Sequence, residues 1–67
     1  MDYGKALRAL REKLLITQTE LAQKLGVSYA SVNRWENKKC EPTMKAKRKI
    51  VELCKKNDVS LNGGNNL

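Results

Sequence analysis

The sequence predicts a compact, all-α domain of four to five helices. Its 67 residues suffice for one domain with a single hydrophobic core, and apolar residues recur at helical spacing in several short segments. Phenylalanine is absent and most apolar side chains are aliphatic, which fits packed helices better than a sheet. We expect this domain to span residues 1–61 and the polar, glycine-rich residues 62–67 to form a disordered tail.

The first predicted helix follows Asp2, whose carboxylate can cap it. Apolar residues lie on one face of this helix and charged residues on the others. The apolar stripe consists of Tyr3, Leu7, Leu10 and Leu14. The helix should end near Leu14 or Leu15, after which Ile16 is expected to be buried.

Residues 17–36 predict two short amphipathic helices joined by a tight turn. Thr17 and Glu20 have the spacing of a capping box, so a helix should begin at Gln18. Gly26 can adopt the left-handed conformation that ends it, and Ser28 can cap a second helix, from about Tyr29 to Glu36. The apolar contacts between them are assigned to Leu21, Leu25, Val27, Val32 and Trp35, with the small Ala22 allowing close approach. This is the layout of a helix-turn-helix.

The second of these helices has one apolar and one polar face. Val32 and Trp35 share the inner face, so we assign Trp35 to the core rather than to a stacking platform. The outer face carries side chains that could recognise a partner: Tyr29, Ala30, Asn33, Arg34 and Asn37.

A loop and one more helix complete the predicted domain. Residues 37–42 show no apolar periodicity and end in proline, and Thr43 can cap a helix from about Met44 to Lys56. Its inner face contains Ala46, Ile50, Leu53 and Cys54. Val59 and Leu61 are expected to fold back onto the core through a turn that begins near Asp58 or Ser60.

The few cysteines and the absence of histidine limit which disulfides and metal sites the chain can form. Cys54 is predicted to be a core residue and Cys40 to lie in a loop, so no disulfide between them is expected. Two cysteines without a histidine cannot supply the four ligands of a structural zinc site, and we expect no metal or other cofactor. No secretory signal and no apolar run of membrane length is present, which predicts a cytoplasmic protein.

Positive charge is concentrated in one segment of the chain. The formal net charge is +7, to which residues 1–37 contribute +2, residues 38–56 contribute +6 and residues 57–67 contribute −1. A basic block is ordinarily a solvated helix face. Because this block directly follows the helix with the polar outer face, we favour contacts with nucleic-acid phosphates.

Several short motifs occur in order along the chain. They are Leu7-Arg8-x-x-Arg11, Ile16-Thr17-Gln18, Glu20-Leu21-Ala22, Leu25-Gly26-Val27-Ser28, Ser31-Val32-x-Arg34-Trp35-Glu36-Asn37 and Pro42-Thr43. With these motifs the chain, from about Leu7 to Leu61, resembles the DNA-binding domain of the Cro/CI repressors, the xenobiotic response element family of small bacterial and phage regulators. The resemblance implies a lambda-repressor-like fold and a transcriptional regulator, expected to be a repressor, that binds double-stranded DNA specifically.

The resemblance also assigns roles to individual residues. Base contacts are expected from Tyr29, Ala30 and Arg34, with Asn33 close by. Phosphate contacts are expected from Gln18, at the start of its helix, and from Ser28, Asn37, Lys38, Lys39 and Thr43. Arg11 and Glu36 are expected to form a structural ion pair between the first and third helices.

Two departures from the family concern helix ends. Relatives often carry glycine where this chain has Leu15 and Lys38. A leucine in the left-handed conformation costs roughly 1 kcal/mol or more, so the first turn should be wider or strained. At the second site we expect Asn37 to take the positive φ, because asparagine tolerates it best after glycine.

Other functions remain open at this point. Catalysis has little support, because there is no histidine, no serine or cysteine with an evident base beside it, and no phosphate-binding loop after a strand. A protein-binding or antitoxin-like helical module with the same fold is the main alternative, although Arg34 and the lysines after it favour DNA. A nonspecific or RNA-binding protein would more often show several exposed aromatic residues, and only Tyr29 qualifies.

Assembly is expected to depend on DNA. Regulators of this family usually act as symmetric homodimers, but Asn62-Gly63-Gly64 cuts short the segment that relatives often use as a fifth helix. We therefore expect a monomer or weak dimer free in solution that pairs on a palindromic site.

Overall fold

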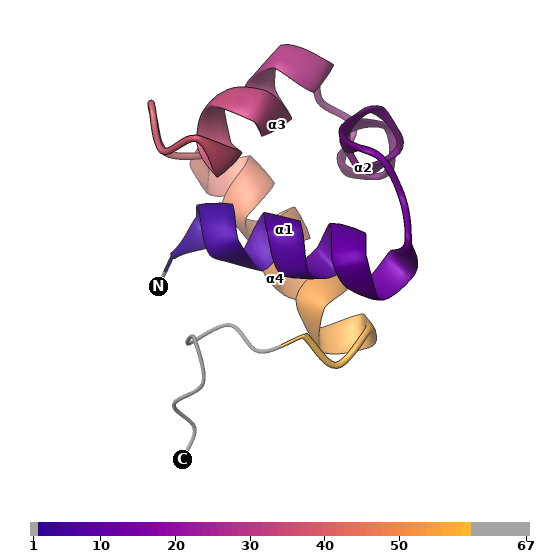
Figure 1. The fold of residues 1–67 in the computed structure, drawn as a ribbon. Coiled ribbons are helices and arrows are strands. Elements are labelled where there is room, and N and C mark those ends of the chain that lie inside the picture. The colour runs from indigo at the N-terminus through magenta and orange to yellow at the C-terminus, as the bar shows by residue number, and fades with distance from the viewer. Residues whose placement is uncertain (1, 60–67) are drawn as a thin grey trace.

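The helix starts follow directly from capping side chains. In the computed structural model, which describes residues 2–59, the chain forms α1 (Tyr3–Leu14), α2 (Gln18–Leu25), α3 (Tyr29–Glu36) and α4 (Met44–Lys56) (Figure 1). The residue before each helix accepts a hydrogen bond from the backbone amide three positions on; these residues are Asp2, Thr17, Ser28 and Thr43. Every predicted helix start is therefore confirmed, and so is the all-α fold class for the described residues.

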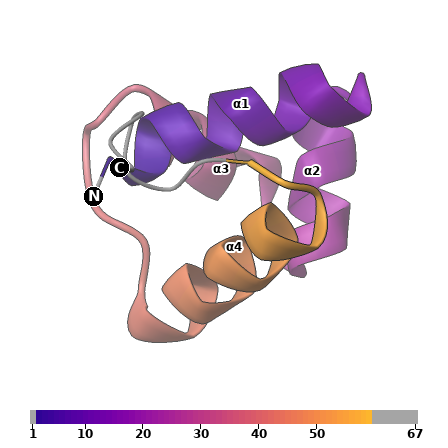
Figure 2. The same ribbon diagram turned by 90° about the horizontal axis from the view of Figure 1, so that it is seen from below.

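The four helices enclose one core. The α2 and α3 helices pack against each other, and α1 packs against both α3 and α4 (Figure 1). Viewed from below, α1 and α4 lie across from each other, with α3 farther from the viewer (Figure 2). Each helix contributes side chains with no exposed surface: Leu7, Leu10, Leu21, Val32, Ile50 and Cys54. Trp35 and Cys54 belong to the core as predicted, and Cys40 is exposed. None of the described helices has both the length and the apolar character needed to cross a membrane.

The turn between α1 and α2 is strained, as the sequence predicted. Leu15 adopts the left-handed conformation, with φ 58° and ψ 49°, although it carries a side chain that this region disfavours. Its side chain is 88% exposed and so gains little from packing. Ile16, expected to be buried, is only half-buried against the core.

The prediction for the end of α3 is wrong by one residue. Asn37 has φ −88°, and Lys38 instead takes the positive φ, at 60°. The amide of Lys39 donates to the carbonyl of Arg34, and the amide of Lys38 donates to the carbonyl of Trp35. These two hydrogen bonds form a Schellman motif, which requires the left-handed residue at the position after the cap. Asn37 is that cap, and the positive φ therefore falls to Lys38.

After α4 the chain turns back to the core, as predicted. Asp58 has a φ of 58°, and the amide of Val59 donates to the carbonyl of Cys54 over 2.8 Å. Val59 then packs against the core. The expected contribution of Leu61 and the expected disorder of residues 62–67 lie outside the described residues.

The start of α1 approaches the end of α3 closely at Gly4. A Cβ atom added to Gly4 would lie 2.8 Å from the carbonyl oxygen of Trp35 and 3.3 Å from that of Glu36. The absence of a side chain at this position thus permits the close contact. It brings the arginines of α1 within reach of Glu36.

Candidate nucleic-acid interface

The outer face of α3 presents an open set of side chains. Tyr29 is 52% exposed, and Ala30 and Arg34 are also exposed. Arg34 forms no ion pair with any residue between 2 and 59, so its guanidinium is available to a ligand. These are the three residues for which the resemblance implied base contacts.

A partly buried ion pair fixes α3 against α1. Glu36 is only 3% exposed, and Arg11 donates from Nε to Oε2 over 2.8 Å and from Nη2 to Oε1 over 2.7 Å. These hydrogen bonds raise the pKa of Arg11. Arg8 lies nearby, with its Nε 3.8 Å from Glu36 Oε1, and is more exposed. The two-point geometry restricts both the position and the rotation of α3 relative to α1.

The side chain of Gln18 is also engaged with Glu36. Its Nε2 donates to Glu36 Oε1 over 2.9 Å, and its Oε1 accepts from Asn33 Nδ2 over 3.2 Å. Asn33 in turn accepts a hydrogen bond from Asn37 Nδ2 over 3.2 Å. Gln18 and Asn33 are half-buried and Asn37 is exposed. No sequence pattern predicts this arrangement, because it depends on how α2 and α3 cross.

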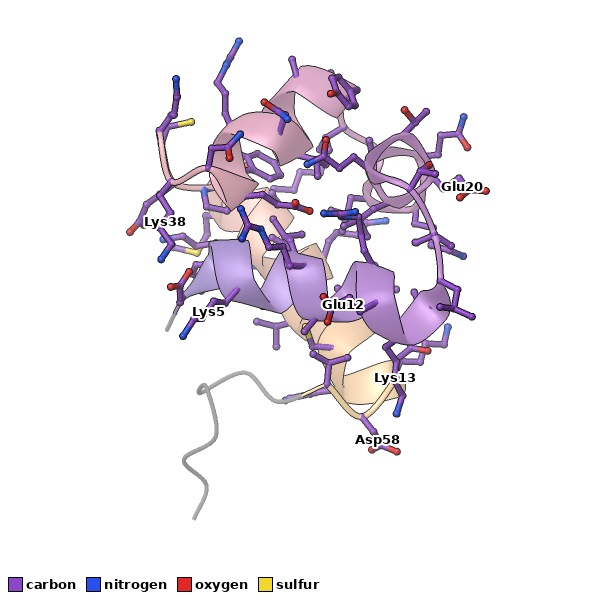
Figure 3. All side chains as sticks on the ribbon, viewed as in Figure 1. Lys5, Glu12, Lys13, Glu20, Lys38 and Asp58 are labelled. Atoms are coloured by element: carbon purple, nitrogen blue, oxygen red, sulfur yellow. The ribbon has the colours of Figure 1, made fainter. Side chains whose placement is uncertain are left out.

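The remaining phosphate candidates surround the two ends of α3. Ser28 caps the start of α3, where its hydroxyl also lies 3.0 Å from that of Ser31. At the other end Lys38 lies beside the start of α1 (Figure 3) and pairs with Asp2 over 2.9 Å. Lys39 is exposed and forms no ion pair with the described residues. Thr43 caps α4 and is exposed. Lys39 is therefore the least constrained cation next to α3.

The fold divides the basic block seen in the sequence. Lys38 and Lys39 lie directly after α3, whereas Lys45 and Lys49 of α4 lie beside the turn of residues 25–27 that precedes α3. Lys47 of α4 pairs with Glu41 over 3.0 Å, and its ammonium lies 5.2 Å from the centre of the Tyr3 ring. Both contacts occupy Lys47 within the protein.

Comparison with known proteins identifies the architecture. A helix-turn-helix family model of the Cro/CI type matches residues 7–62. The chain belongs to this family. Its four helices accord with the lambda-repressor-like fold, and the family is one of DNA-binding regulators. Neither the curated proteins nor the solved structures gave a significant match.

Proposed function

We propose that this member of the family is a sequence-specific transcriptional repressor that places α3 in the major groove of double-stranded DNA. The observation that carries the proposal is the exposed face of Tyr29, Ala30 and Arg34 on a helix fixed from behind by the Arg11–Glu36 pair. A helix with its side chains is about 10–12 Å across, which suits a groove about 12 Å wide. A reading helix must also hold its angle to the groove, which a rigid attachment to α1 favours.

The three exposed residues suit different contacts. Arg34 can donate two hydrogen bonds to O6 and N7 of guanine. Ala30 has only a methyl group and could contact the methyl group of thymine. Tyr29 could do the same or donate its hydroxyl to a phosphate. We therefore assign the largest share of base discrimination to Arg34.

Phosphate contacts are proposed on both sides of α3. Gln18 and Ser28 lie at the starts of α2 and α3, where backbone amides can bind an anion. The segment after α3 can contact the next phosphates along the DNA strand through Asn37, Lys38, Lys39 and Thr43. Such contacts orient the protein on DNA without reading sequence.

We further propose that two copies bind a palindromic site with half-sites one turn of DNA apart, about 34 Å. Val59 is partly buried against the core, which leaves little of its surface for a partner interface. Pairing would therefore depend mainly on the DNA, with a monomer or weak dimer in its absence. Sedimentation at micromolar protein, with and without the selected site, tests this; a tight dimer without DNA would reject it.

Selection of binding sites from a random duplex library tests the proposed function. We expect one preferred sequence with twofold symmetry and an affinity that falls steeply with salt, since each neutralised phosphate adds about 0.9 to the log–log slope. Equal affinity for all duplexes at moderate salt would reject specific reading, and no binding at all would favour a protein-binding module.

Two variants separate reading from positioning on the selected site. Arg34→Ala should cost roughly 1–3 kcal/mol and relax the preference at one base pair, whereas Lys39→Ala should weaken binding to all sequences alike. Both residues are exposed and neither forms an ion pair with the described residues, so the fold should tolerate both changes. If Arg34→Ala lowered specific and nonspecific binding by the same factor, Arg34 would not contact a base.

A further inference from the structure

Three side-chain amides form a continuous line from buried Glu36 to the surface. Gln18 donates to Glu36, Asn33 donates to Gln18, and Asn37 donates to Asn33, with donor–acceptor distances of 2.9, 3.2 and 3.2 Å. We call Gln18, Asn33 and Asn37 the amide chain. It begins on α2, crosses to α3 and ends beside the residues proposed to contact DNA.

The charge of Glu36 sets the direction of the amide chain. A carboxylate paired with arginine can only accept hydrogen bonds, so Gln18 must turn its NH₂ group toward Glu36. The carbonyl oxygen of Gln18 then faces Asn33, which must present its own NH₂ group. The carbonyl oxygen of Asn33 then faces Asn37, which must present its NH₂ group in turn. Any one amide turned around would place two donors or two acceptors opposite each other.

This arrangement limits what Asn33 can do. An asparagine that reads adenine uses its carbonyl oxygen and its NH₂ group together, on N6 and N7 of the same base. Each end of the Asn33 amide makes one hydrogen bond within the protein, to Gln18 and from Asn37, so these bonds set the orientation of the amide group and it cannot turn freely to align both ends with a base. Turning Asn33 toward a base would leave the half-buried carbonyl oxygen of Gln18 without its donor, which is unfavourable.

From these contacts we propose that Asn33 is a positioning residue and not a base-reading one. The amide chain holds Asn33 along α3, and base discrimination is left to Tyr29, Ala30 and Arg34. Gln18 keeps one N–H hydrogen outside the chain, which can contact a phosphate while its carbonyl oxygen stays bonded to Asn33. This inference rests on the proposed function, because it divides labour within the same DNA-binding surface.

The amide chain itself can be tested without DNA. In NMR spectra of the free protein, one hydrogen of each NH₂ group in the chain should exchange more slowly with water than those of exposed Gln23. Asn33→Ala should restore fast exchange at Asn37 but leave the protected hydrogen of Gln18, whose bond to Glu36 remains. Exchange at Gln18 and Asn33 as fast as at Gln23 would show that the chain is absent and would overturn the inference.

The division of labour is tested by repeating site selection with Asn33→Ala and, as the matched control on the same helix, Arg34→Ala. Asn33→Ala should retain the preferred sequence and lose several-fold in affinity, by a similar factor on preferred and unrelated duplexes. Arg34→Ala should change the preferred sequence at one base pair. Loss of preference at one base pair in Asn33→Ala would overturn the inference.

Failure of the two proposals can be told apart. A wild-type protein with no preferred duplex would reject the proposed function, and with it the assignment of Asn33, even if the NMR exchange pattern were as expected. A wild-type protein with a preferred duplex but fast-exchanging amides would reject the amide chain alone. Thermal melting of Asn33→Ala shows that any change in binding is not caused by loss of the fold.

Discussion

The Arg11–Glu36 pair should respond very differently to loss of its two members. In Arg11→Met the carboxylate of Glu36, whose side chain is 2% exposed, loses both hydrogen bonds from Arg11. Removing one partner of a buried pair costs about 3–5 kcal/mol. Arg8 lies 3.8 Å away and Gln18 still donates to Glu36, so we expect a loss at or just below the lower end of this range, about 2–3 kcal/mol.

Loss of the Glu36 carboxylate should destabilise the protein less than loss of Arg11. In Glu36→Gln the unpaired group is Arg11, whose side chain is 28% exposed and can be hydrated. The new amide can still accept one hydrogen bond from Arg11, so the cost should be about 1–2 kcal/mol. The double variant Arg11→Met/Glu36→Gln removes both charges and should be more stable than the sum of the two single losses predicts.

Thermal and urea unfolding followed by circular dichroism would measure these differences. For a domain of this size 1 kcal/mol corresponds to about 4–8 °C in Tm, so Arg11→Met should melt roughly 10–20 °C lower than wild type. Lys13→Met is the matched control, since Lys13 is an exposed cation of α1 without an ion pair among the described residues (Figure 3). An unchanged Tm in Arg11→Met, or a larger loss in Glu36→Gln, would refute this reasoning.

Three further changes probe the backbone and the surface. Leu15→Gly should raise Tm, because it relieves about 1–2 kcal/mol of left-handed strain at an 88% exposed position. The greater conformational entropy of glycine in the unfolded chain offsets only about 0.5–1 kcal/mol of this gain, so a lower Tm would contradict the prediction. Gly4→Ala should cost about 1–3 kcal/mol because its Cβ would lie 2.8 Å from the Trp35 carbonyl oxygen, and an unchanged Tm would show that α1 shifts freely. The hydrogen bond to Lys38 lowers the pKa of Asp2, so the ionised carboxylate adds stability that is lost as pH falls below the usual pKa of 3.8. Asp2→Asn should therefore show a shallower fall of Tm in acid than wild type, and the same dependence of Tm on pH in both proteins would argue against the pair.

Helix starts were predictable because their determinants are local. Each cap lies within four residues of the amide it accepts, so Thr17 and Glu20 can be recognised as a capping box in the sequence alone. Helix ends were harder. The Schellman motif after α3 depends on where the last backbone hydrogen bonds fall, and sequence preference favoured Asn37 although Lys38 takes the left-handed conformation.

The candidate site was predictable by residue type but not by arrangement. Periodicity placed Tyr29, Ala30 and Arg34 on the outer face of α3, where they lie. It could not show that Gln18 contacts Glu36, because these residues are 18 positions apart and meet only through the packing of α2 on α3. Nor could it show that the lysines of α4 divide, with Lys45 and Lys49 beside the turn before α3 and Lys47 against the Tyr3 ring of α1.

The shortness of α3 has a consequence for the relation between folding and binding. Its eight residues are fewer than the 12–15 or so that an isolated helix needs to be even marginally stable in water. A peptide of residues 28–39 should therefore be largely unstructured, and the helix exists only while α1 and α2 hold it. DNA that binds the folded form alone would then act as a stabilising ligand, raising the melting temperature as its concentration exceeds Kd. A destabilising change anywhere in the core would correspondingly weaken DNA binding at physiological temperature, without altering any residue that faces the DNA.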